Sequence, residues 1–127
     1  MLASLWVALG GALGSVGRYW AGVYVARWLG EAFPWGTLFI NILGSFIIGF
    51  FATLTVADGP MPASANARLF VMAGICGGFT TFSAFSLQTL ALARNGHWDW
   101  AAGYVALSLL LCLIGVTFGH ILADRIG

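Results

Sequence analysis

The sequence has no lysine and very little charge of either sign. Only 7% of its 127 residues are charged, and five arginines and four acids leave a net charge of +1. Soluble domains carry about 25% charged residues, so this composition excludes a soluble protein. A chain with no basic patch also offers no surface for nucleic acid. The composition therefore indicates an integral membrane protein.

Groups that carry enzyme chemistry are also scarce. Cys76 and Cys112 lie inside apolar stretches, and we expect both to be buried free thiols. His97 and His120 have no second ligand near them in the sequence. A membrane enzyme would need a nucleophile beside a base, or a cluster of metal ligands. The sequence shows neither, so we expect that the protein is not an enzyme.

Hydrophobic residues are abundant, at 61% of the chain, and they fall into four long segments. A membrane-spanning helix needs roughly 20 apolar residues. The segments predict helices over approximately residues 2–28, 35–56, 68–94 and 98–122. Short turns follow the first and third, and a polar loop over residues 57–67 follows the second. We therefore predict an all-α membrane protein, with four transmembrane helices in one integral membrane domain over residues 1–127.

The third segment contains an unusual stretch near its middle, residues 77–86. Two glycines followed by two threonines make a poor helix interior, so we expect the third helix to break near the midplane, across Gly77 to Thr80. A break at this depth frees carbonyl oxygens that protein or an ion must satisfy. Doubled by a two-fold axis, these carbonyls would suit one monovalent cation, because no carboxylate lies near to balance a divalent charge.

Phe82 and Phe85 follow the predicted break and share one helical face. Aromatic rings have positive edges. Their edges would favour an anion, with the Asn41 amide and the hydroxyl of Ser83 or Ser108 as donors. The spacing alone is much more typical of core packing, and both interpretations stay open at this point.

Two further polar features lie inside apolar segments. Arg18 shares a face with Gly10, Gly14 and Gly22, and small residues at this spacing let another helix approach closely. Arg18 could bond carbonyls of a neighbouring helix, or it could supply a positive potential for an anion. In the second segment Thr37, Asn41, Ser45 and Gly49 form a stripe, which either joins helices by hydrogen bonds or lines a wet pathway.

The arginines near the segment ends are balanced between the two sides of the membrane. With four spans, Arg68 and Arg125 lie on one side, and Arg27 and Arg94 lie on the other. Orientation is set mainly by basic residues in short loops, so this balance favours insertion in both directions. Two copies could then pair antiparallel about an axis in the membrane plane. The alternative is that five arginines are too few to decide the orientation.

Three motifs carry a resemblance to a known family. Residues 77–86, Gly-Gly-Phe-Thr-Thr-Phe-Ser-Ala-Phe-Ser, closely resemble the signature of the Fluc-type fluoride channels, the CrcB family. Residues 35–44, which contain Gly36, Thr37 and Asn41, stand where that family has its G-T-x-x-x-N motif. Residues 14–19 look like its first-helix arginine motif. The resemblance covers essentially the whole chain.

The resemblance implies an antiparallel, dual-topology homodimer in the bacterial inner membrane, with two separate fluoride pathways. It implies a structural Na⁺ ion at the dimer centre, held by main-chain carbonyls of Gly77 and Thr80 from both subunits. The activity would be passive, fluoride-selective export from the cytoplasm, which lowers cellular fluoride. Matched to the family, the anion pathway would comprise Arg18, Thr37, Asn41, Phe82, Ser83, Phe85, Tyr104 and Ser108.

The sequence departs from the family pattern at two positions. Members commonly have an acid where this chain has Gln88, and a hydroxyl residue where it has Cys112, whose thiol is a weaker donor.

Two other functions remain to be compared. A small multidrug-type proton antiporter would need a carboxylate within the membrane, and all four acids lie at segment ends. A non-transporting assembly subunit would use Arg18 and the Asn41 stripe only to join helices.

Overall fold

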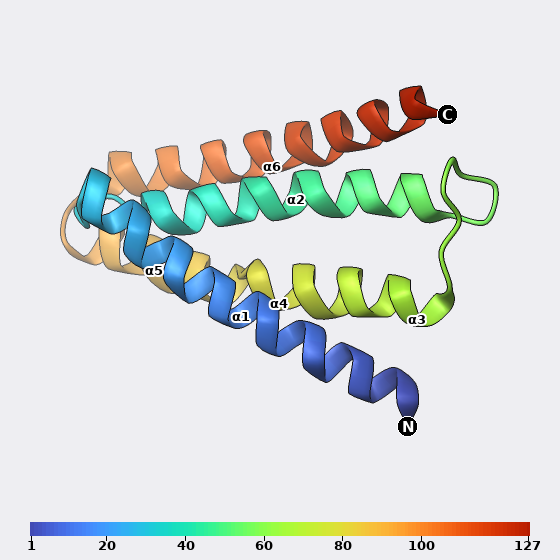
Figure 1. Cartoon of the computed structure of the whole chain (residues 1–127). Helices are drawn as coiled ribbons and strands as arrows, with labels where there is room; N and C mark the ends of the chain where they lie inside the picture. Colours follow the sequence, from blue (N-terminus) through green and yellow to red (C-terminus); the bar gives the residue numbers. More distant parts are fainter.

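The computed structural model describes all residues from 1 to 127, and it contains only helices and their connections. The prediction of an all-α protein is confirmed. Figure 1 shows the arrangement, in which the third segment is divided into several pieces. The elements are α1 (Leu2–Leu29), α2 (Trp35–Thr55), α3 (Ala65–Arg68), the π-helix η1 (Leu69–Cys76), α4 (Gly77–Phe79), α5 (Phe82–Arg94) and α6 (Trp98–Ile126).

Three helices are long and apolar enough to cross a membrane: α2, the third helix taken as Ala65–Arg94, and α6. This makes the chain a multi-pass membrane protein and confirms three of the four predicted spans. Helix α1 has 28 residues, which at about 1.5 Å per residue is also long enough to span. It is not among the three, and it contains Arg18 and several glycines. Its crossing of the membrane remains a prediction.

The broken third helix runs beside α2, which packs along α6, and α1 crosses the broken helix obliquely (Figure 1). Both termini and the connection between α2 and α3 lie at one end of the molecule. The crossing of α1 is close because it has glycine at the contact. A Cβ atom at Gly14 would collide with the carbonyl oxygen of Ile75, and one at Gly10 with that of Phe70. The predicted small-residue face of the first segment is thus confirmed at these two positions.

Little of the chain is buried. Only 17 of 127 residues are buried, and large apolar side chains such as Leu13, Leu110 and Phe118 are more than half exposed. Apolar surface on this scale is stable only against lipid or another protein.

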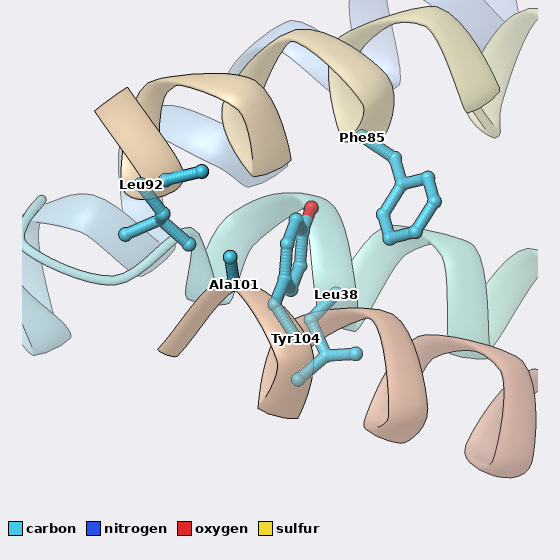
Figure 2. Packing of buried hydrophobic residues seen from close by; sticks show 6 residues of the cluster. Leu38, Phe85, Leu92, Ala101 and Tyr104 are labelled. Carbon is cyan, nitrogen blue, oxygen red and sulfur yellow. The ribbon is translucent and has the colours of Figure 1, made fainter. Parts of the chain in front are cut away.

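One apolar cluster holds α2, α5 and α6 together at the end opposite the termini. Figure 2 shows Leu38, Phe85, Leu92, Ala101 and Tyr104 directed toward one another from these three helices. Tyr104 is completely buried there. The cluster fixes the side chains of Phe85 and Tyr104, which both belong to the predicted anion pathway.

The third helix is broken, but slightly later than predicted. The break was expected across Gly77 to Thr80, whereas Gly77 is helical, with φ −63° and ψ −37°, and α4 continues to Phe79. The extended residues are Thr80 and Thr81, with ψ 158° and 117°. The glycines therefore do not make the break by unusual dihedral angles. Gly78 instead lies close to α1, where a Cβ would come within 2.5 Å of the Gly11 carbonyl oxygen.

Candidate functional site

The break is held open by one side chain from α2. Asn41 Nδ2 donates to the carbonyl of Thr81 over 3.1 Å, and the Thr81 N–H donates to Asn41 Oδ1 over 2.8 Å. The amide thus bonds the Thr81 backbone as a neighbouring strand would, and it satisfies both polar groups of that residue. Thr81 also starts α5, because its hydroxyl oxygen accepts from the N–H of Ala84 over 3.1 Å.

These bonds release two carbonyl oxygens from helical pairing. In an α-helix the carbonyl of Gly77 would accept from the N–H of Thr81, which here donates to Asn41. The carbonyl of Thr80 would accept from the N–H of Ala84, which here donates to the Thr81 hydroxyl. Gly77 and Thr80 are the two residues whose carbonyls were predicted to bind a cation. Neutral oxygens of this kind are suitable ligands for a hard cation.

Arg18 takes up a third carbonyl beside the break. Its Nε donates to the Gly78 carbonyl oxygen over 3.0 Å, joining α1 to α4. Of the two interpretations of this arginine, the structure confirms that it bonds a carbonyl of a neighbouring helix. A guanidinium so held is half-buried inside the protein, and this explains how α1 accommodates a charge in its middle.

A groove of about 370 Å³ lies along the break, between α2, the third helix and α6. Four of the predicted anion-path residues line it, namely Asn41, Phe82, Phe85 and Ser108. Both predicted cation ligands, Gly77 and Thr80, also line it. Residues separated by up to 67 positions in the sequence therefore meet on one surface.

The aromatic side chains form a continuous row at one end of the groove. The ring centroids of Phe82 and Phe85 are 5.3 Å apart, and those of Phe85 and Tyr104 are 5.0 Å apart, each pair tilted by 55°. Phe82 is 74% exposed in the protomer, whereas Phe85 is 8% exposed. The predicted shared face of the two phenylalanines is confirmed. Tyr104 lies behind Phe85, and its hydroxyl donates to Gln88 Oε1 over 2.9 Å.

Ser108 is the buried polar side chain that lacks a hydrogen-bond partner in the protomer. Its Oγ has almost no exposed surface and no partner, although it belongs to the groove lining. An unsatisfied buried hydroxyl costs about 1–3 kcal/mol. Its O–H is therefore available to a species in the groove that accepts a hydrogen bond. The amide of Asn41 has a second N–H that is not used by Thr81, so it too can donate.

Four predicted anion-path residues do not line this groove, namely Tyr104, which lies behind Phe85, and three others. Arg18 bonds Gly78, and neither residue lines the groove. Thr37 lines a separate polar hollow together with Gln88. Ser83 is exposed, with its hydroxyl 3.3 Å from that of Thr81. Their part in an anion pathway remains a prediction.

Comparison with known proteins identifies the family. A family model described as "CrcB-like protein, Camphor Resistance (CrcB)" matches residues 5–120. The chain belongs to the CrcB family. It is 61% identical over 119 residues to a protein of Opitutus terrae, covering 94% of this chain and 90% of the relative. Its identity is 57% with a protein of Rhodospirillum rubrum and 54% with one of Methylocella silvestris, with at least 91% of each chain covered. All three relatives are named "Fluoride-specific ion channel FluC".

In this CrcB protein the two departures from the family pattern occupy defined places. Gln88 accepts the hydrogen bond of the Tyr104 hydroxyl, and a neutral amide can do this without a charge. Cys112 lines the groove one turn after Ser108, as a free thiol. Cys76 is likewise a free thiol and is buried, as predicted, whereas Cys112 is only half-buried, so the prediction that both thiols are buried is wrong for Cys112.

The sequence analysis of this CrcB chain missed the central role of Thr81. A threonine directly before the first helical residue is a common N-cap, which accepts from an N–H two or three residues further on. This signal was present in Thr81-Phe82-Ser83-Ala84. The bonds between Thr81 and Asn41 had no such signal, because they join residues 40 positions apart.

Proposed function

We propose that the protein is a passive, fluoride-selective channel that exports fluoride across a bacterial inner membrane. The observation that carries this proposal is the groove itself. It combines an unused Ser108 hydroxyl, an unused Asn41 N–H and the rings of Phe82 and Phe85. The names of the relatives, which are called fluoride-specific ion channels, also support the proposal.

The proposed mechanism replaces water around the anion, donor by donor. Fluoride accepts hydrogen bonds from Asn41 Nδ2 and Ser108 Oγ, and it meets the positive edges of the two phenylalanine rings. Chloride is larger and accepts hydrogen bonds less strongly, so this donor set suits it poorly. None of the lining residues is charged, which lets the anion leave as readily as it enters.

We propose that α1 is the fourth span and that two chains pair antiparallel. The bond from Arg18 to Gly78 supports the first point, since it keeps the charge of α1 away from lipid. The second rests on the arginine balance. Arg125 lies in the last turn of α6, and Arg68 ends α3. The C-terminus and the α2–α3 connection lie at one end of the molecule (Figure 1). Arg27 and Arg94 lie in the last turns of α1 and α5, which end at the opposite side. The broad exposed apolar faces leave room for a second copy.

We propose further that a structural Na⁺ ion lies between the two copies. The carbonyls of Gly77 and Thr80, which have lost their helical donors, would hold it from both subunits. A monovalent ion suits this neutral site, and it would link the interrupted third helices of the two copies. We expect removal of sodium to slow or stop fluoride flux.

The test is ion efflux from liposomes that contain the purified protein, followed with a fluoride-selective electrode. Rapid fluoride release, with no release of chloride, is expected. A proton antiporter would instead exchange protons for a cation, and it would need a carboxylate within the membrane. The four acids do not supply one, because all lie in loops or terminal helical turns, namely Glu31, Asp58, Asp99 and Asp124. An assembly subunit would release neither ion.

A further inference from the structure

A large apolar hollow lies at the end of the molecule that holds both termini. It is formed between the end of α2 and the start of the third helix, and its volume is about 610 Å³. Arg68 is the only charged residue that lines it. None of the predicted anion-path residues lines it, so the proposed channel does not account for this feature.

The guanidinium of Arg68 is held in place but only partly used. Its Nη1 donates to the carbonyl oxygen of Ala52 over 3.1 Å and to the hydroxyl oxygen of Thr55 over 2.6 Å. A guanidinium has five N–H donors in a fixed planar arrangement. Both bonds use one nitrogen, which leaves the hydrogens on Nε and Nη2. No carboxylate lines the hollow to neutralise the charge.

The position of Arg68 along the chain places this charge at the membrane surface. It is three residues inside Ala65–Arg94, the third segment that is apolar enough to span. Leu69, Met72 and Ala73 line the hollow in the following turn of the same helix. The hollow therefore has a cationic end at the interface, and apolar walls that lead toward the bilayer interior.

We propose that this hollow binds one anionic phospholipid. The lipid phosphate pairs with the free N–H groups of Arg68, and an acyl chain lies along Leu69, Met72 and Ala73. Arginine matches phosphate by parallel hydrogen bonds, and a basic residue beside a span attracts anionic lipid. A free phosphate ion would leave the apolar walls uncovered, whereas a phospholipid matches both parts of the hollow.

Native mass spectrometry of the purified protein, titrated with phosphatidylglycerol, tests this site. Arg68→Gln is expected to weaken binding of one lipid per chain about five-fold or more, the factor for one basic residue at the surface. Arg125→Gln is the matched control, because it removes the same charge from the last turn of α6, outside the hollow, next to the C-terminus at the same end of the molecule (Figure 1). Ala73→Trp keeps Arg68 but fills the apolar part, and we expect it to weaken binding as well.

Unchanged lipid affinity in Arg68→Gln would overturn the proposal. So would an equal loss in Arg125→Gln, since that would show attraction by net charge alone. Arg68→Gln also loses its bonds to Ala52 and Thr55 and could unfold, in which case Ala73→Trp decides. If Ala73→Trp leaves lipid affinity intact, the hollow binds no lipid and the proposal is wrong. If Ala73→Trp alters only the oligomeric state, the hollow is filled by a second copy and the proposal is also wrong.

Discussion

At the scale of single residues, Asn41 determines the local structure of the site. Its amide donates to and accepts from the backbone of Thr81, so it substitutes for the helical hydrogen bonds that the break removes. The same amide retains one N–H directed at no protein acceptor. A single side chain thereby stabilises the irregular backbone and contributes a donor to the groove.

Asn41→Asp tests this double role. The carboxylate can still accept from the Thr81 N–H, but it cannot donate to the Thr81 carbonyl, and it places a negative charge beside the path. We expect fluoride flux to fall by more than about ten-fold, since an unpaired charge in this environment costs several kcal/mol. Flux in Asn41→Asp equal to that of the native protein would remove Asn41 from the pathway.

Phe82 and Phe85 supply the second test at this scale. Replacing either with isoleucine retains much of the apolar volume and removes the ring edge. We expect each variant to fold and to lose most of its fluoride flux, measured by efflux from liposomes. Phe39→Ile, which changes an exposed ring on α2 outside the groove, should conduct normally. Full flux in both Phe82→Ile and Phe85→Ile would place the anion path elsewhere.

At the scale of elements, the broken third helix shows what a sequence can and cannot predict. The position of the break was predicted to within about two residues, because adjacent glycines and threonines are poor helix formers. Its cause was not predictable, since the carbonyls of Gly78 and Thr81 are satisfied by Arg18 and Asn41, 60 and 40 positions away. The π-helical turns of η1 likewise had no signal in hydrophobic periodicity. Local propensity marks the weak point of a helix, whereas partners far along the chain fix its geometry.

The crossing of α1 over the third helix can be tested with two neighbouring glycines. Gly14→Ala would force a Cβ against the Ile75 carbonyl, whereas a Cβ at Gly11 meets nothing within 4 Å. We expect Gly14→Ala to lower stability by about 1–3 kcal/mol through overpacking. Gly11→Ala should be neutral or stabilising by up to about 1 kcal/mol, because alanine favours the helix. Thermal unfolding in detergent measures both, and equal unfolding temperatures would contradict the close approach of α1.

At the scale of the whole molecule, the surface indicates what the protomer lacks. Its groove is open, Phe82 is mostly exposed, and the groove is lined by Gly77 and Thr80, whose carbonyls have lost their helical donors. A second, inverted copy would cover the groove and double the carbonyl ligands. Three of the four spans predicted from the sequence are confirmed. A surface for a second copy could not be predicted from the sequence, since lipid-facing and partner-facing helices are equally apolar.

The inverted pairing predicts that the chain inserts in both orientations. A reporter fused to the C-terminus, active on only one side of the membrane, should give a signal from both sides in roughly equal amounts. Adding lysines to the α2–α3 connection should shift the population toward the orientation with that loop inside. A single uniform orientation of the native chain would exclude the antiparallel dimer, and with it the symmetric sodium site.

The central claim is that fluoride crosses passively and alone, and the reversal potential of the protein in a bilayer tests it most directly. With unequal fluoride on the two sides, the account predicts that net current vanishes at the equilibrium potential of fluoride. Gradients of chloride, sodium or protons should leave that potential unchanged. A potential that shifts with the sodium or proton gradient would reveal coupled transport, and one that follows chloride would show an unselective pore. Either result would contradict the account.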